Sequence, residues 1–106
     1  MRKEKRERLK RAGWKVGDTK DFLGLDDAEM AIIDIRVSLA AALKRRRLAR
    51  SMSQAALARR IGSSQSRVAK MEAGDPSVSL DLLIRTLLTS GSTSEDIAQA
   101  IATAAA

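Results

Sequence analysis

The centre of the chain holds two apolar-periodic segments joined by a glycine, in the stretch Gln54-Ala55-Ala56-Leu57-Ala58-Arg59-Arg60-Ile61-Gly62-Ser63-Ser64-Gln65-Ser66-Arg67-Val68-Ala69-Lys70-Met71. The apolar residues Leu57, Ile61, Val68 and Met71 recur at helical spacing and predict the inward faces of two helices. Gly62 can adopt the left-handed conformation that a tight turn needs. Ala58 is small where the second helix must approach closely. The stretch therefore predicts two helices that cross steeply at a tight turn.

The outward side chains of the second predicted helix are all able to form hydrogen bonds with nucleic acid. They are Gln65, Ser66, Arg67 and Lys70, which suit base edges and phosphates. Residues 44–70 carry nine basic side chains and no acidic one, whereas residues 12–43 have a net charge of −3 and residues 71–106 one of −4. Positive charge concentrated in one segment is what a polyanion-binding face requires.

Serines mark the starts of the short helices, because a serine hydroxyl can accept a hydrogen bond from a free amide of the first turn. Ser53 can cap a helix over Gln54–Ile61, Ser64 one over Gln65–Ala73, and Ser79 a third that carries an apolar stripe from Leu80 to Leu88. These helices are expected to end at Gly62, at Gly74-Asp75-Pro76 and at Gly91.

A longer helix precedes this central region. Asp26 and Glu29 have capping-box spacing, and from there the buried stripe Ile32, Ile35, Leu39 and Leu43 runs toward about Arg50. After Gly91, Ser92 and Glu95 repeat the capping-box spacing before a last helix that holds Ile97 and Ile101. We therefore expect an all-α bundle of five or more helices.

Three parts of the chain differ in composition. Residues 1–25 form a basic tail and loop, residues 26–91 the central domain, and residues 92–106 a C-terminal helix. The first eleven residues have a net charge of +5 and only two apolar side chains, so they are a solvated tail or an accessory phosphate-binding arm.

Several functional classes are disfavoured by what the sequence lacks. It contains no cysteine and no histidine, which removes disulfides, thiolate zinc sites, the commonest metal ligands and the commonest general base. We expect no catalytic residue, no bound metal and no cofactor. Without a long apolar segment, we also expect a soluble, cytoplasmic protein with no membrane partner.

The central stretch resembles the Cro and phage-repressor helix-turn-helix family, also called the XRE family. The resemblance rests on Ser53–Ala58, Ile61-Gly62, Ser64–Val68 and Glu72–Gly74, and it extends over roughly Ile32 to Leu88. It implies a DNA-binding bundle of the lambda-repressor type. Ser63 departs from the family, which usually has an apolar residue after the turn glycine.

The resemblance also implies roles for individual side chains. Gln54 would contact a phosphate and steady a neighbouring base-contacting residue, while Ser64 and Arg67 would contact the DNA backbone. Gln65, Ser66 and Lys70 would contact bases. Because Arg45, Arg46 and Arg47 immediately precede the motif, we expect them to contact phosphates as well.

A second resemblance, to antitoxins of the host-inhibition-of-growth type, rests on Phe22–Glu29, Leu43–Arg47, the central motif and Ser79–Leu83. The sequence therefore leaves three functions open. The first is a regulator that binds double-stranded DNA at an operator as a homodimer, because the apolar stripes Leu80–Leu88 and Ile97–Ile101 exceed what so small a domain needs to bury; the sequence leaves open which surface pairs. The second is an antitoxin with a toxin protein as partner, and the third is non-specific binding of nucleic acid. With aromatic residues at only 2% of the chain, there is little platform for stacking single-stranded bases.

Overall fold

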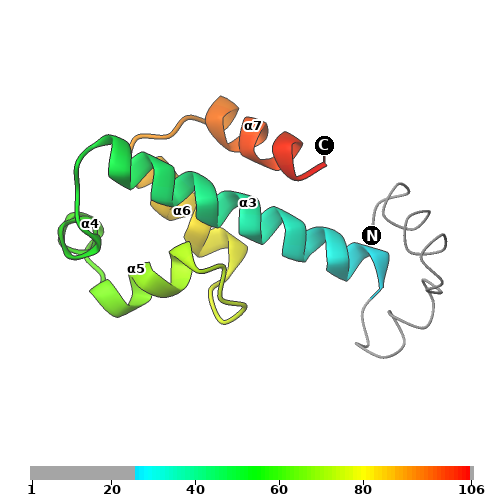
Figure 1. Ribbon diagram of the computed structural model, residues 1–106, viewed down its shortest axis with the longest axis horizontal. Coiled ribbons are helices and arrows are strands. Elements are labelled where there is room, and N and C mark those ends of the chain that lie inside the picture. Colours follow the sequence, from blue (N-terminus) through cyan, green and yellow to red (C-terminus); the bar gives the residue numbers. More distant parts are fainter. Residues whose placement is uncertain (1–25, 106) are drawn as a thin grey trace. The chain divides into compact units, whose positions relative to one another are not determined.

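The computed structural model describes residues 26–105 (Figure 1). In this range the chain is helical and contains no strand, which confirms the all-α prediction. The helices are α3 (Asp27–Ala49), α4 (Gln54–Ile61), α5 (Gln65–Glu72), α6 (Leu80–Thr89) and α7 (Ser94–Ala105). The predicted basic tail and loop, residues 1–25, lie outside the described residues. The chain divides into two compact units, Met1–Asp34 and Ile35–Ala106, and the sites discussed below lie in the second.

The predicted serine caps are confirmed at α4, α5 and α6. The hydroxyl oxygen of Ser53 accepts from the Ala56 amide at 3.0 Å, and those of Ser64 and Ser79 accept from the amides three residues on, each at 3.1 Å. Each bond satisfies one amide that has no partner within its helix. At the start of α3, Asp26 likewise accepts from the Glu29 amide at 2.7 Å, as its spacing predicts.

The capping box of α7 lies one residue later than predicted. The Thr93 amide donates to Asp96 Oδ2 at 2.8 Å, and the Asp96 amide donates back to Thr93 Oγ1 at 3.1 Å. The prediction of Ser92 with Glu95 was wrong because both pairs have the same spacing, and the sequence does not fix which of them the turn before α7 presents. The hydrogen bond from the Thr93 amide holds the pKa of Asp96 below its usual value.

The core of the second unit lies where α3 packs against the shorter helices. Leu39 and Leu43 of α3 are fully buried, and Ile35 packs against them in part. Ile32, predicted to belong to the same stripe, is 43% exposed. Within residues 35–105, α5 lies on one side of α3, α7 lies on the opposite side, and α6 lies behind α3 in the view of Figure 1. The shorter helices contribute the buried side chains Leu57, Val68, Met71, Leu83, Leu87 and Ile97.

The apolar stripe of α6 was expected to supply core or dimer contacts, and the structure places most of it, with Ile97 of α7, in the core. Leu83 and Leu87 are at most 2% exposed and Ile97 is 9% exposed, because they pack in the core of their own chain. Leu88 alone among the large apolar residues of α6 stays largely exposed, at 47%. Leu83, Leu87 and Ile97 are therefore not free to contact a second chain. Among the described helices, none has the length and apolar character needed to cross a membrane.

Candidate nucleic-acid interface

The turn between α4 and α5 depends on Gly62. Its φ is +69°, in the left-handed region, and it follows the last residue of α4 directly. The Ser63 amide donates to the Ala58 carbonyl oxygen at 2.8 Å and so closes the end of the helix. A Cβ at Gly62 would meet no atom within 4 Å, so the backbone conformation, and not a lack of space, favours glycine here.

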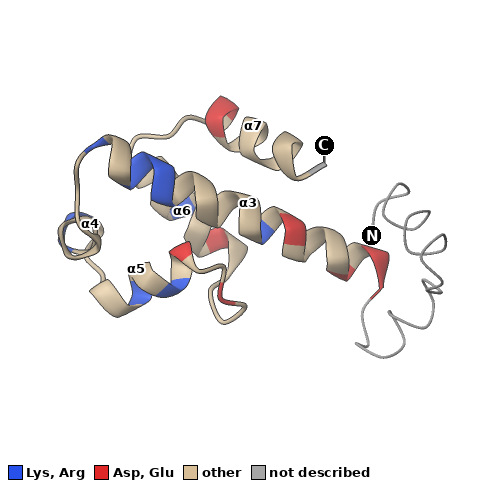
Figure 2. Cartoon of the chain, in the orientation of Figure 1, with Lys and Arg blue, Asp and Glu red and all other residues tan. Residues whose placement is uncertain are grey.

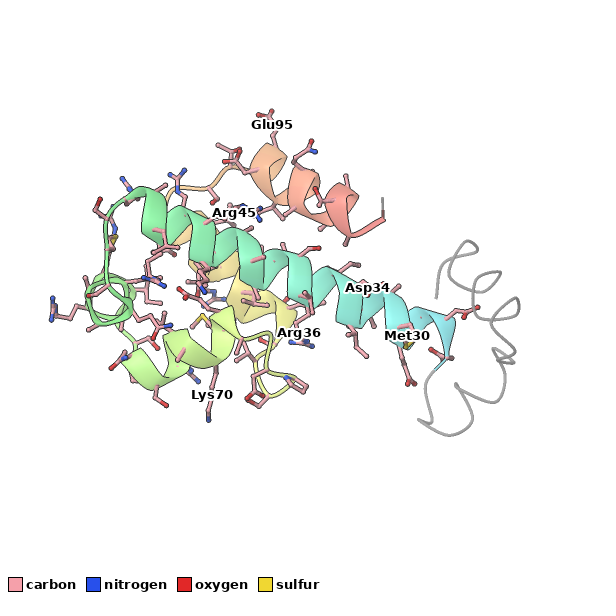
Figure 3. All side chains as sticks on the ribbon, in the orientation of Figure 1. Met30, Asp34, Arg36, Arg45, Lys70 and Glu95 are labelled. Carbon is pink, nitrogen blue, oxygen red and sulfur yellow. The ribbon has the colours of Figure 1, made fainter. Side chains whose placement is uncertain are left out.

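Helix α5 has one buried face and one exposed face. Val68 and Met71 are fully buried, as predicted, and fix the helix on the domain. The predicted base-contacting residues Gln65, Ser66 and Lys70 are exposed, as is Arg67. Lys70 points away from α3 in Figure 3. Figure 2 shows basic residues on α5 and on the neighbouring α4, and Arg67 and Lys70 make the exposed face of α5 itself positively charged.

A chain of hydrogen bonds runs from the exposed start of α5 into the domain. Gln65 Nε2 donates to Gln54 Oε1 at 3.4 Å, and Gln54 Nε2 donates to Glu72 Oε1 at 3.2 Å. Glu72 also accepts two bonds from Arg47, at 2.6 Å from Nε and at 2.9 Å from Nη2. The third nitrogen of Arg47, Nη1, donates to the Met52 carbonyl oxygen at 2.9 Å. The position of the Gln65 side chain is thus linked to a fixed ion pair.

This ion pair is nearly enclosed. The side chains of Arg47 and Glu72 are 10% and 4% exposed, and their two parallel hydrogen bonds have the bidentate geometry of strong arginine–carboxylate pairs. These bonds to Glu72 raise the pKa of the Arg47 guanidinium above its usual value. Arg47 therefore remains a cation whose charge is directed into the domain.

The three consecutive arginines at the end of α3 do not share one face, because successive helical residues are turned by about 100°. Arg47 faces Glu72, whereas Arg46 Nε donates to the Ser90 carbonyl oxygen after α6 at 3.2 Å. Arg45 lies beside α7, and Figure 3 places it on the opposite side of α3 from Lys70. The three arginines therefore do not act as one group, and contact of each with a phosphate stays a prediction.

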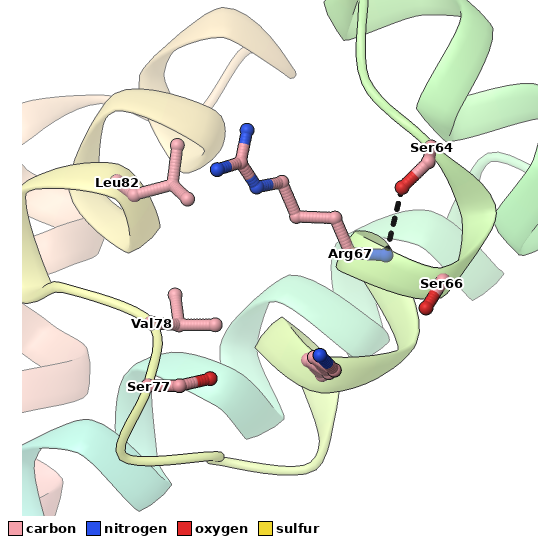
Figure 4. Close-up of a pocket in the computed structure, with 7 residues that line it drawn as sticks. Ser64, Ser66, Arg67, Ser77, Val78 and Leu82 are labelled. Atoms are coloured by element: carbon pink, nitrogen blue, oxygen red, sulfur yellow. Dashed lines mark hydrogen bonds between the residues drawn. The ribbon is translucent and has the colours of Figure 1, made fainter.

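A hollow of about 280 Å³ lies beside α5. Figure 4 shows the Arg67 side chain extending across it toward Leu82, with Ser64 at one end and Ser77 on the far wall. The polar side chains that line it are Ser64, Ser66, Arg67, Lys70 and Ser77. All of these can donate hydrogen bonds, and none carries negative charge, so the hollow suits an anionic group.

Residues 43–85 match the family model described as Helix-turn-helix. The match begins in α3, spans α4, the Gly62 turn and α5, and ends in α6. The match covers 43 of the 106 residues and agrees with the resemblance of this segment to helix-turn-helix proteins of the Cro and phage-repressor type. The match supports a DNA-binding transcriptional regulator in general terms. Neither the curated proteins nor the solved structures gave a match to the chain.

Two residues that support the helix-turn-helix domain had no role assigned from sequence. Glu72 anchors Arg47 and Gln54, and the available signal was its place as the first acid after the long basic segment. Arg36 of α3 donates through Nη1 to the Val78 carbonyl oxygen and so holds the loop between α5 and α6. No sequence pattern indicates this second contact, because the two residues are 42 positions apart.

Proposed function

We propose that this protein is a transcriptional regulator that binds a specific double-stranded DNA operator as a homodimer. Helix α5 enters the major groove, and Gln65, Ser66 and Lys70 contact base edges. The observation that carries the proposal is the hydrogen-bonded chain from Gln65 through Gln54 to the Arg47–Glu72 pair. A side chain held before binding loses less conformational freedom when it meets a base, which favours specific recognition.

Backbone contacts come from the edges of α5 in this proposal. Ser64 and Arg67 lie along the hollow beside the helix, where a phosphate oxygen can meet several donors at once. Gln54 lies at the first turn of α4 and can turn one amide hydrogen to a phosphate while its oxygen still accepts from Gln65. Arg47 serves as a positioning residue, and Arg45 and Arg46 make no contact with the half-site bound by their own α5.

Selection of bound duplexes from a random pool tests the proposal. A regulator of this kind enriches one defined sequence with two-fold symmetry, whose half-sites lie about one helical turn, roughly 34–36 Å, or a multiple of it apart. Binding that enriches no sequence contradicts the proposal and leaves non-specific binding of nucleic acid. The same experiment with single-stranded oligonucleotides is expected to give much weaker binding.

The antitoxin function stays a second prediction that rests on sequence resemblance. It differs from the first proposal in one observable, because an antitoxin co-purifies with the product of a small neighbouring gene and suppresses its toxicity. Such a protein would also bind its own operator. Co-expression with the neighbouring gene is therefore the experiment that separates an antitoxin from a regulator without a protein partner.

A further inference from the structure

One face of α3 remains uncovered within the second unit. Val37, Ala41, Lys44 and Leu48 recur at spacings of four, three and four, so they lie on one face, which we call the α3 outer face. All four are exposed, and the two large apolar side chains, Val37 and Leu48, are 55% and 56% exposed. The opposite face of α3 carries Leu39 and Leu43 in the core.

The neighbouring elements border this face without covering it. The loop after α5 reaches one edge, where Gly74 lies beside Val37 and Ala40. Helix α7 forms the other edge, where a hollow of about 130 Å³ lies between Val37, Ala41 and Arg45 of α3 and Ala100 and Thr103 of α7. In Figure 1 no other described helix passes in front of α3. Two large apolar side chains about three turns apart are thus left more than half exposed within the unit.

We propose that a second copy of this chain covers the α3 outer face, with the two α3 helices antiparallel. This inference rests on the proposed function, because a two-fold operator calls for a two-fold protein. The four residues match their own two-fold copy. Val37 and Leu48 lie equally far along the helix from the point midway between Ala42 and Leu43, and so do Ala41 and Lys44. Each Val37 then meets the partner's Leu48.

The charge on the face fits the same pairing. Lys44 is its single charged residue, and in this register it lies against the partner's Ala41, whose small side chain leaves room for the lysine stem. A lysine can cover apolar surface with its methylene groups while its ammonium stays in water at the edge. An acidic partner would form an ion pair with only one residue of this face, Lys44. In a pair of identical chains, the apolar residues Val37 and Leu48 contact each other instead.

The direction of the face also suits binding of both copies to one duplex. In Figures 1 and 3, α5 lies on one side of α3 with Lys70 pointing away from α3, and α7 lies on the opposite side. The outer face borders Gly74, in the loop after α5, and Ala100 of α7, so it lies between these two sides. A two-fold axis that runs in the direction from α3 to α5, in front of the outer face, leaves both α5 helices on the same side. Both can then face a single DNA duplex.

The area that one helix face can bury is too small for a stable dimer. Residues 37–48 of a helix span about 18 Å, whereas a stable specific interface buries roughly 800 Å² on each partner. One helix face of this length supplies only part of that area. The pairing is therefore expected to be weak in free solution and to be strengthened when two half-sites hold both copies together.

Cross-linking between introduced cysteines tests the pairing in the full chain, which contains no cysteine of its own. A mixture of Val37→Cys and Leu48→Cys chains at high concentration, without DNA, should form a disulfide-linked dimer under mild oxidation. Each variant alone should not, because identical positions lie eleven residues, about 16 Å, apart in the antiparallel pair. Leu88→Cys mixed with Leu48→Cys is the control, since Leu88 is exposed to a similar degree on α6.

A second measurement uses Leu48→Asp and needs no cross-link. On a selected duplex with two half-sites its affinity should fall on the order of 100-fold, with affinity for one half-site unchanged. The pairing is overturned if Val37→Cys alone cross-links as well as the mixture, or if Leu48→Asp binds two half-sites like the unaltered chain. If cross-linking succeeds and no sequence is selected, the proposed function fails and the pairing stands. If one sequence is selected and no cross-link forms, the proposed function stands and the α3 pairing fails.

Discussion

The Ser63 hydroxyl lies at the turn of the DNA-binding motif, buried and without a hydrogen-bond partner. A buried hydroxyl that has given up its hydrogen bonds to water and forms none with the protein lowers the stability of the fold. Ser63→Ala removes the hydroxyl and is expected to raise the free energy of unfolding by about 1 kcal/mol. Urea denaturation measures the change. Ser53→Ala serves as the opposite control, because it removes a helix cap and should destabilise by about 1 kcal/mol. A less stable Ser63→Ala would show that the hydroxyl has a partner.

Arg45 and Arg47 are two residues apart on α3, and their environments differ sharply. Arg47→Ala leaves the nearly buried carboxylate of Glu72 without its cation and should cost about 3–5 kcal/mol of stability. Arg45→Ala, at an exposed position, should change stability by less than about 0.5 kcal/mol. Thermal or urea unfolding of both variants checks the contrast. Equal effects would mean that the Arg47–Glu72 pair does not form in solution.

Helix α7 begins with a reciprocal pair of hydrogen bonds between Thr93 and Asp96. Because the folded pKa of Asp96 is lowered, its stabilising effect is present above the ordinary aspartate pKa of 3.8 and is lost as the pH falls through the lower folded value. Asp96→Asn should therefore reduce stability at neutral pH and flatten its decline in acid, as followed by circular dichroism. Glu95→Gln, which alters the neighbouring exposed acid, should leave that decline intact. An unchanged acid profile in Asp96→Asn would contradict the capping role.

The starts of the short helices could be predicted from sequence because each cap is a contact between residues three positions apart. Ser53, Ser64 and Ser79 behave as their local sequence indicates. The roles of Arg46 and Arg47 could not be predicted in the same way, because their partners Ser90 and Glu72 are 44 and 25 positions away. A run of arginines looks uniform in sequence, whereas the turn of the helix gives each member a different neighbour.

The same distinction applies to surfaces of the whole molecule. Charge concentrated in residues 44–70 indicates a polyanion-binding region, and the exposed polar face of α5 lies within it. In sequence, the apolar stripe of α6 could equally be a core or a dimer surface. In the structure it lies in the core with residues of α3 and α7. Which apolar stripe remains free depends on how the helices pack, so α3, and not α6, presents the uncovered face.

Salt dependence distinguishes the DNA-facing cations from the others. Removing one phosphate contact lowers the slope of log affinity against log salt concentration by about 0.9. Arg67→Ala, beside the hollow at α5, should show this change, whereas Arg45→Ala, on the side of α7, should leave the slope nearly unaltered on a single half-site. Fluorescence anisotropy over a range of salt concentrations gives both slopes. Equal reductions in the two variants would place Arg45 in the interface after all.

The central claim is that the exposed face of α5 determines which DNA sequence is bound. The most direct measurement compares the affinity of the Gln65→Ala, Lys70→Ala double variant for the selected duplex and for a scrambled one. Each lost base contact should remove about 1–3 kcal/mol of discrimination, while the fold, held by Val68 and Met71, stays intact. The account predicts that the two affinities converge. A double variant that still prefers the selected duplex as strongly as the unaltered chain would contradict it.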